Sequence, residues 1–242
     1  MERISIITIY GLLFGMFGTV LGGIIGANLK IKSNKFLSFV LEFASGLMTA
    51  IICFDLIPKA LEFSKITGCI LGIMIGIVAM IICDAIISKI NFRKKNINDN
   101  QLLKTGMIIC IGLAVHNFPE GLAIGSGFDV SRRLGLSLAI AIAIHDVPEG
   151  ISIALPINNS GYGKLKAILL TALSGVTTGI GALCGAVIGN LSKELIGLSL
   201  AFAAGSMLYI VSCELIPESN RMYKGRFSSF GNIFGITIRY FS

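Results

Sequence analysis

The sequence contains no tryptophan, only two histidines and few charges: Asp, Glu, Lys and Arg make up 14% of its 242 residues. Soluble proteins have about 25% of such residues. Apolar residues make up 54% of the chain, and the mean hydropathy is +0.85. This composition excludes a soluble enzyme, a disordered chain and a nucleic-acid-binding module. It predicts an all-α polytopic membrane protein surrounded by a lipid bilayer.

The six cysteines include no Cys-x-x-Cys pair, so a disulfide framework is not expected. The first apolar run has no basic leader and is too long for a cleavable signal peptide. The net charge of +7 does not indicate nucleic acid, because membrane proteins concentrate Lys and Arg in their cytoplasmic loops. The 29 glycines suit closely packed transmembrane helices.

A membrane-spanning helix needs about 20 mostly apolar residues. Seven segments meet this requirement, and an eighth is shorter and contains Arg239. The predicted spans are Ile4–Asn28, Phe36–Ile57, Ile66–Ile87, Leu103–Ser126, Leu134–Leu155, Leu165–Asn190, Ile196–Ile216 and Phe227–Phe241. We therefore predict one transmembrane domain over residues 1–242.

Most of the basic residues lie in the connections after the first, third, fifth and seventh spans. By the positive-inside rule these connections are cytoplasmic, so both termini face outside. The longest and most polar of them, about residues 89–102, is the predicted cytoplasmic loop. The sequence thus predicts a multi-pass protein of the cell membrane.

The sequence contains two internal repeats. The pattern His-x-x-Pro-Glu-Gly occurs at His116–Gly121 and again, 29 residues later, at His145–Gly150. Phe43–Met48 aligns with Phe202–Met207, and at the same offset of 159 the segment Asp55–Pro58 aligns with Glu214–Pro217. The charge pattern orients these two spans in opposite directions, which is typical of inverted-repeat transporters. The repeats fit a grouping of three, two and three spans. Ordinary helix packing is the alternative explanation of Phe-Ala-x-Gly-x-Met, but the carboxylate and the proline coincide at the same offset as well.

The two central spans contain the residues suited to metal chemistry. His and Glu four residues apart lie on one face of a helix, in both copies of the motif. Pro119 and Pro148 each remove a backbone donor, which predicts a kink and a free carbonyl oxygen. Charges inside a membrane persist only with partners, and a shared cation is one such partner. The predicted ligands are His116, Asn117, Glu120, His145, Asp146 and Glu149.

Imidazole and carboxylate ligands suit Zn²⁺ and other divalent first-row metals rather than Na⁺ or K⁺. A proton relay through the same residues is the alternative. Four further polar residues are weaker candidates for a transport pathway. Asp84 lies deep in the third span, whereas the carboxylates near span ends also suit ordinary solvated helix ends. The four are Asp55, Asp84, Cys213 and Glu214.

The doubled motif, His116–Gly121 and His145–Gly150 with support from Phe202–Glu218, resembles the ZIP family of divalent metal transporters, in particular its bacterial zinc-uptake and GufA-like branch. The resemblance covers nearly the whole chain. It implies one or two metal ions between the fourth and fifth spans, held by the six predicted ligands. It also implies that Asp84, Cys213 and Glu214 form a cytoplasmic exit route.

The chain departs from this family where many relatives have a glutamate on the sixth span. Here the segment continues as Val176-Thr177-Thr178, so one and two bound ions both stay open. The predicted function is uptake of a divalent cation, Zn²⁺ foremost, with Fe²⁺, Mn²⁺ and Cd²⁺ as further candidates. A homodimer is compatible with the sequence.

Two alternatives are an intramembrane metal-dependent protease or hydrolase and a selective metal channel. A protease of this kind needs a His-Glu-x-x-His helix or its equivalent, whereas each motif here has one histidine and a proline. We therefore predict a transporter that is not an enzyme. The sequence does not separate a carrier from a channel.

Overall fold

Long helices form the regular structure of the part of the chain that is described, which comprises residues 2–28, 34–92, 101–159, 161–189 and 191–241 of a computed structural model. Two of the helices are interrupted by a π-helical turn, labelled η1 and η2. In order, the elements are α1 (Glu2–Asn28), α2 (Asn34–Ala50), η1 (Ile51–Leu56), α3 (Ile57–Phe63), α4 (Ile66–Phe92), α5 (Gln101–Val130), α6 (Arg132–Asn159), α7 (Lys164–Gly189), α8 (Lys193–Ile210), η2 (Val211–Leu215), α9 (Ile216–Met222) and α10 (Phe227–Phe241).

The structure corrects two predicted span ends. The second and seventh spans were expected to end at Ile57 and Ile216, but helical structure continues through α3 and α9. Pro58 and Pro217 each follow a π-helical turn directly. A proline inside a continuous α-helix loses a hydrogen bond and clashes with the carbonyl four residues before it. The wider π turn is a local adjustment that accommodates this, and such turns are frequent at functional sites.

The predicted cytoplasmic loop is shorter than expected, because α4 continues to Phe92 and α5 begins at Gln101. The rest of the predicted loop, residues 93–100, lies outside the described residues. The six cysteines are all free, as expected.

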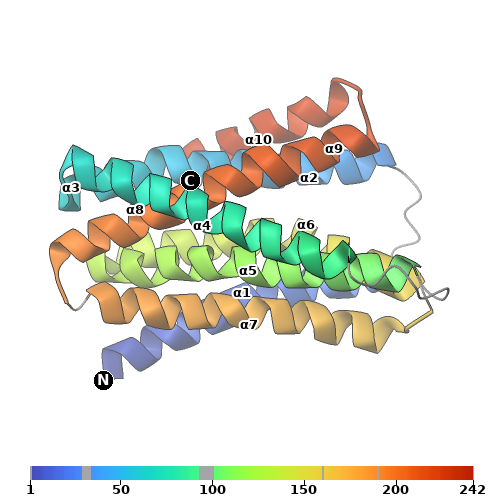
Figure 1. Ribbon diagram of the computed structural model, residues 1–242, viewed down its shortest axis with the longest axis horizontal. Helices are drawn as coiled ribbons and strands as arrows, with labels where there is room; N and C mark the ends of the chain where they lie inside the picture. The colour runs from blue at the N-terminus through green and yellow to red at the C-terminus, as the bar shows by residue number, and fades with distance from the viewer. Residues whose placement is uncertain (1, 29–33, 93–100, 160, 190, 242) are drawn as a thin grey trace.

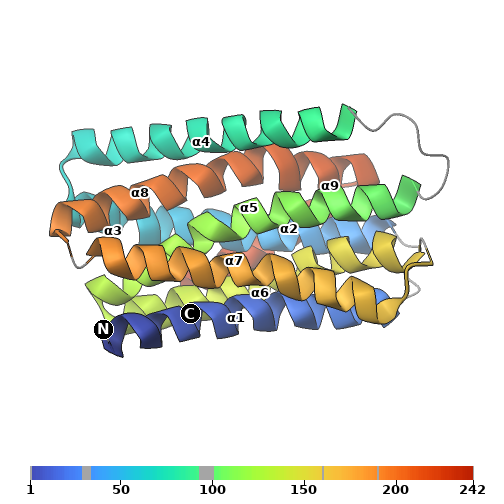
Figure 2. The same ribbon diagram turned by 60° about the horizontal axis from the view of Figure 1, so that its bottom comes forward.

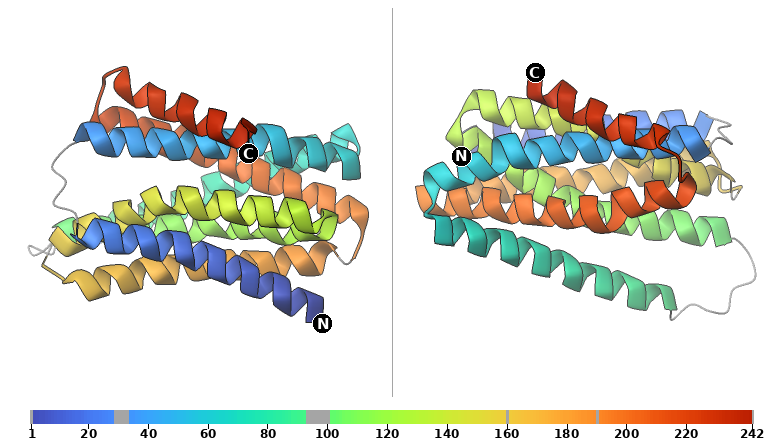
Figure 3. Two further views of the ribbon diagram at one scale, coloured as in Figure 1. Left: turned by 180° about the vertical axis from the view of Figure 1, so that it is seen from behind. Right: turned by 90° about the horizontal axis from the view of Figure 1, so that it is seen from above.

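The helices lie roughly parallel to one long axis (Figure 1). Helices α5 and α6 lie in the middle, with α1 and α7 on one side and α2, α8 and α10 on the other (Figures 1 and 3). Helix α4 packs along α8 at the edge of the bundle (Figure 2). The central position of α5 and α6 shields the doubled motif from its surroundings.

The inverted repeat predicted from sequence is present in the packing of the outer helices. Gly46 packs so closely on α10 that a side chain there would collide with the carbonyl of Asn232. Gly205 lies 159 residues after Gly46, and Ile73 lies 159 residues before Asn232. A side chain at Gly205 would collide with the carbonyl of Ile73 in the same way. The contact of α2 with α10 therefore reappears as the contact of α8 with α4.

The same correspondence holds for the contacts of α1 and α7 with the central helices. The offset of 159 residues relates α1 to α7, and the offset of 29 residues relates the two motifs. Gly22 of α1 lies against the carbonyl of Val147 in α6. Its counterpart, Gly181 of α7, lies against the carbonyl of Phe118 in α5. Helices α1 and α7 thus hold the two motif helices in equivalent ways, so a difference between the motifs must come from other contacts.

Six helices or helix pairs are long and apolar enough to cross a membrane, judged on the described residues. They are α1, α2 with α3, α4, α6, α7, and α8 with α9. Large apolar side chains on α1, α4, α7 and α10 point outward, as helices in lipid require. The predicted all-α polytopic fold is confirmed. The count of eight spans stays a prediction, since α5 is not among these six and α10 has only 15 residues.

Candidate metal centre

Helices α5 and α6 place the motif residues deep inside the bundle. Both helices continue through the motif prolines, Pro119 and Pro148. All six predicted ligands are buried, with at most 3% of any residue exposed. Since charged groups are rarely buried without partners, such a concentration in two adjacent helices marks a site and not ordinary core packing.

Three of the six predicted ligands form a compact cluster. Glu120 of α5 and His145 and Glu149 of α6 each present one ligand atom, and these atoms lie within 4.8 Å of one another. His145 Nε2 lies 3.0 Å from Glu120 Oε1, at hydrogen-bond distance. Asp146 Oδ1 is 3.4 Å from the same nitrogen. One nitrogen and two carboxylates around a common point are a ligand set that Zn²⁺ takes in proteins.

Unpaired acceptors concentrate around this cluster. Buried polar groups in proteins nearly always have a hydrogen-bond partner, so each exception needs an explanation. Within the described residues, buried side-chain oxygens of the cluster that have no such partner are Oε2 of Glu120, Oε2 of Glu149 and both carboxylate oxygens of Asp146. Several buried acceptors facing one region are what a bound cation satisfies, so the residues fit a divalent metal ion.

His116 and Asn117, two of the other predicted ligands, have partners outside the cluster. His116 Nε2 lies 2.9 Å from Glu214 Oε1, which belongs to η2. Asn117 donates through Nδ2 to the carbonyl of Ser174 in α7, at 3.0 Å. Its Oδ1 is unpaired and remains available as an oxygen ligand. Three of the six predicted ligands thus form the cluster. Asp146 lies beside the cluster, His116 contacts Glu214, and Asn117 is bonded to α7.

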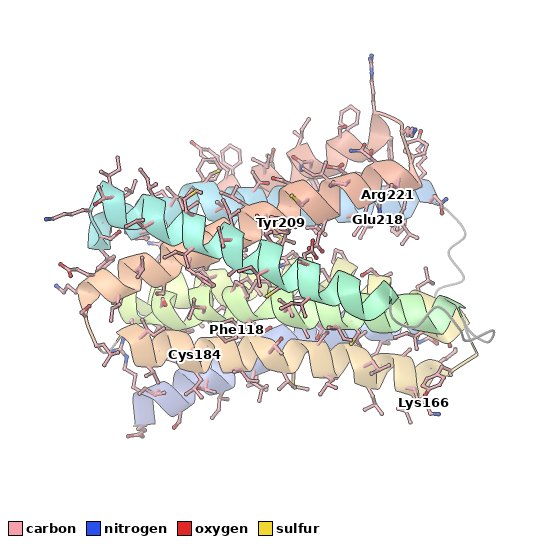
Figure 4. All side chains as sticks on the ribbon, viewed as in Figure 1. Phe118, Lys166, Cys184, Tyr209, Glu218 and Arg221 are labelled. Atoms are coloured by element: carbon pink, nitrogen blue, oxygen red, sulfur yellow. The ribbon has the colours of Figure 1, made fainter. Side chains whose placement is uncertain are left out.

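The weaker pathway candidates are distributed over both halves of the bundle. Tyr209 of α8 donates to Asp84 Oδ2 of α4 at 2.8 Å, and Figure 4 shows Tyr209 about midway along the bundle. Cys213 is exposed, one turn beyond Tyr209. Asp55 of η1 accepts two hydrogen bonds from Arg239 of α10. The structure therefore does not bring Asp55 and Asp84 into the cluster.

Sequence reasoning overlooked Tyr209 and did not assign a role to Thr178. Tyr209 precedes Cys213 by four residues and so faces the same side of α8, a spacing that could have indicated it. Thr178 lies in the segment of the sixth predicted span where, by the family resemblance, a glutamate was expected. Its hydroxyl is buried and without a hydrogen-bond partner, and it lies against Gly15. A hydroxyl offers a weaker ligand than a carboxylate at a second metal position.

Comparison with known proteins identifies the family of the chain. The sequence profile of the ZIP zinc transporter family matches residues 93–241, which is more than half of the chain. The chain is 32% identical over 248 residues to the zinc transporter ZupT of Chlorobium chlorochromatii, which covers 93% of this chain and 92% of the relative. The chain belongs to the ZIP family. The predicted family is thereby confirmed.

Two other relatives match over a shorter region. The zinc transporter GufA of Myxococcus xanthus is 39% identical over 135 residues, which span 55% of this chain and 53% of GufA. The zinc transporter ZIP11 of Xenopus tropicalis is 40% identical over 139 residues, or 54% of this chain and 41% of ZIP11. The aligned region is thus about half the length of these two relatives. Because the ZIP family is a family of transporters, the prediction that the chain is not an enzyme is confirmed, and the hydrolase alternative is not favoured.

Proposed function

We propose that this ZIP protein moves a divalent cation, Zn²⁺ foremost, across the membrane through the centre formed by Glu120, His145 and Glu149. The observation that carries the proposal is the buried three-residue cluster with its unpaired carboxylate oxygens. Three protein ligands leave a coordination position open on Zn²⁺. An open position lets the ion exchange ligands, which a transported ion must do and a structural ion must not.

Proton exchange is part of this mechanism. A hydrogen bond joins His145 Nε2 to Glu120 Oε1 in this structure, so the ion must displace that contact to bind both atoms. Metal ligands bind in their deprotonated form. Arrival of the ion therefore releases protons from the centre, and departure returns them. Fe²⁺, Mn²⁺ and Cd²⁺ accept the same ligand types and are further candidate substrates.

The proposed direction of uptake follows the distribution of basic residues. Lys166 and Arg221, which belong to two of the basic connections, lie at one end of the bundle (Figure 4). We call this the basic end, and the positive-inside rule makes it cytoplasmic. Glu214 lies between the centre and this end and is 31% exposed in its side chain, whereas His116 beside it is 4% exposed. The His116–Glu214 contact therefore supports an exit route toward the cytoplasm.

The outward-facing apolar side chains support a multi-pass location in the cell membrane. In a bilayer they contact lipid, and in a homodimer a second copy would cover some of them. Leu165, Leu169 and Leu173 of α7 are examples, each more than half exposed.

The test is metal flux into liposomes that contain the purified protein, measured for a panel of divalent ions. We expect saturable Zn²⁺ flux, which Glu149→Gln abolishes because it removes a ligand charge from the centre. Glu218→Gln is the matched control, since Glu218 lies on α9 in an exposed ion pair with Arg221. Flux that does not saturate indicates a channel and not a carrier. Normal flux in Glu149→Gln would contradict the site assignment.

A further inference from the structure

Two carboxylates at corresponding positions of the inverted repeat have different partners. Asp55 lies in η1 and Glu214 in η2, and each precedes its proline by three residues. They are 159 residues apart, the offset that relates the packing of α2 on α10 to that of α8 on α4. In an inverted repeat, residues so related face opposite sides of the membrane. Asp55 is thus the outer counterpart of Glu214.

The repeat predicts a partner for Asp55. Glu214 contacts His116, and the counterpart of His116 is His145, 29 residues later. An equivalent arrangement would therefore pair Asp55 with His145. Instead, Arg239 donates to Asp55 Oδ2 from Nε at 3.0 Å and from Nη2 at 2.7 Å. His145 contacts Glu120.

Because of Arg239, the two halves of the repeat differ in charge as well as in conformation. Its side chain is 8% exposed and that of Asp55 is 19% exposed, so this ion pair is largely buried. The position that corresponds to Arg239 in the first half is Met80, which has no charge. A buried guanidinium needs a carboxylate partner, because an unpaired charge inside the bundle is costly. Within the described part of the chain, an arginine pairs with the outer carboxylate of the repeat, whereas the ion-pair partner of Glu214 is His116.

We propose that Arg239 controls the direction in which the metal centre faces. In this conformation Arg239 holds Asp55 while Glu214 contacts His116. In the opposite-facing conformation the two halves exchange arrangements, so Arg239 releases Asp55, Asp55 pairs with His145, and Glu214 leaves His116. This inference rests on the proposed transport function.

The consequence is a bias in the equilibrium between the two conformations. Both conformations contain one contact between a motif histidine and a repeat carboxylate, so these contacts largely balance. The Asp55–Arg239 ion pair exists in only one of them and favours that one. An interaction made in one conformation shifts a two-state population by its full differential free energy. Removing Arg239 should therefore populate the opposite-facing form.

The experiment measures this population without using metal or flux. The six native cysteines are replaced by serine, and Ser126→Cys and Ser199→Cys introduce one thiol on α5 and one on α8, at positions whose hydroxyl oxygens lie 2.6 Å apart in this conformation. These positions join the same two helices as the His116–Glu214 contact but leave every residue of the proposal unaltered. A short bifunctional thiol reagent then cross-links α5 to α8. We expect Arg239→Gln to slow this cross-linking about fivefold. Arg221→Gln, which removes a guanidinium from an exposed ion pair, is the matched control and should leave the rate unchanged.

Two further variants distinguish control of direction from simple attachment of α10. The exchanged pair Asp55→Arg with Arg239→Asp should restore the cross-linking rate, because the ion pair is remade with reversed polarity. If Arg239→Gln does not fold, Arg239→Lys takes its place, and we expect about a twofold slowing because Lys offers a point charge instead of a two-bond fork.

A purely structural role of Arg239 would lower the melting temperature in these variants while cross-linking continues at the unchanged rate, and that result overturns the proposal. Failure of the exchanged pair to restore the rate that Arg239→Gln had slowed also overturns it. Flux assays on the native-cysteine protein separate the two proposals. Absent flux with responsive cross-linking refutes transport alone, and normal flux with unresponsive cross-linking refutes the role of Arg239 alone.

Discussion

Helices α5 and α6 contain the same motif but use it differently. In α6, both His145 and Glu149 belong to the metal cluster. In α5, only Glu120 does, while His116 contacts Glu214 and so joins the centre to the helix of the other repeat. The helices α1 and α7 hold the two copies in equivalent ways. Under the proposed function, equal packing with unequal partners assigns ion binding mainly to the α6 copy and the contact with the other repeat to the α5 copy.

The residues that follow the two histidines show the same division. Asn117 in α5 is anchored by a hydrogen bond to Ser174. Asp146 in α6 has two buried oxygens without a hydrogen-bond partner. A neutral amide that is already bonded suits a structural role, whereas an unpaired carboxylate suits a cation. The comparison therefore predicts that substitutions in α6 weaken metal binding more than the equivalent substitutions in α5.

The largest expected effect is that of the two histidines. His145→Ala should weaken Zn²⁺ binding by at least about 100-fold, because it removes a cluster ligand, and His116→Ala by about tenfold, the loss typical of a residue outside the ligand shell. Isothermal calorimetry on the detergent-solubilised protein measures both affinities. The two variants remove equal side chains, so gel filtration of each checks that folding is unchanged. Equal losses would show that the two motifs contribute equally to the site.

The next effect concerns Asp146. Asp146→Asn gives α6 the residue that α5 already has. It should weaken Zn²⁺ binding about tenfold, because it removes a carboxylate that lies next to the three-residue cluster. The reciprocal Asn117→Asp should not strengthen binding, because a carboxylate there would face the carbonyl of Ser174 without a proton to donate. We expect that variant to melt at a lower temperature instead. Tighter binding in Asn117→Asp would contradict the assigned roles.

The sequence was sufficient to predict the membrane fold and the inverted repeat, and the structure brings three of the predicted ligands, Glu120, His145 and Glu149, close together. Helical periodicity places His145 and Glu149 on one face, and the repeated pattern relates α5 to α6. Periodicity does not determine which neighbour a side chain contacts at 3 Å, because rotamers and tertiary packing decide that. For this reason neither the contact of His116 with Glu214 nor that of Asp55 with Arg239 was predicted.

The π turns are the other feature that sequence could not supply. Asp55 and Glu214 precede prolines, and a proline in a helical pattern ordinarily indicates a helix end. The structure continues both helices because each proline follows a wider turn. The turn η1 packs against α8 and α6, and η2 packs against α2, and a local sequence pattern does not contain such tertiary contacts. The two carboxylates consequently lie inside their helices and not at solvated ends.

Acid should weaken metal binding through the α6 copy more than through the α5 copy. Protons and metal compete for ligand atoms, and imidazole in water titrates near 6.5. We expect Zn²⁺ affinity to fall by up to about tenfold per pH unit below pH 6.5. Equilibrium binding between pH 5 and 7.5 tests this, and His116→Ala should retain most of the decline. A flat profile in the unaltered protein would show that His145 is not a ligand.

The smallest expected effect lies at the C-terminal ends of α5 and α6, which face opposite sides of the membrane. Asp129 follows the predicted span of α5, and its counterpart 29 residues later in α6 is Asn158, which donates to the carbonyl of Ala27 at 2.9 Å. Asp129 Oδ1 lies 3.2 Å from Arg3 Nη2. The other carboxylate oxygen, Oδ2, is buried without a hydrogen-bond partner. Loss of hydration on burial raises the pKa of Asp129 to about 6, and the nearby Arg3 only partly opposes that rise.

A carboxylic acid whose pKa is higher in the folded than in the unfolded state stabilises the fold when it is protonated. The stability that Asp129 contributes is therefore complete below about pH 3.9, the pKa of an unfolded Asp, and is lost as the pH rises through 6. Asp129→Asn keeps a neutral group and gives α5 the amide that α6 has. We expect this variant to be about 1 kcal/mol more stable than the unaltered protein at pH 7.5, since exposure of the helix end to solvent reduces the full effect.

Chemical unfolding of both proteins in detergent, at several values between pH 5 and 8, measures this difference. All other titrating groups are common to both proteins, so their effect cancels in the comparison. The advantage of Asp129→Asn should shrink steadily from pH 7.5 to pH 5, because Asp129 itself becomes neutral. An advantage that does not change with pH would mean that the gain comes from a new hydrogen bond and not from removal of a buried charge. Greater stability of the unaltered protein at pH 7.5 would mean that the ion pair with Arg3 outweighs the cost of burial.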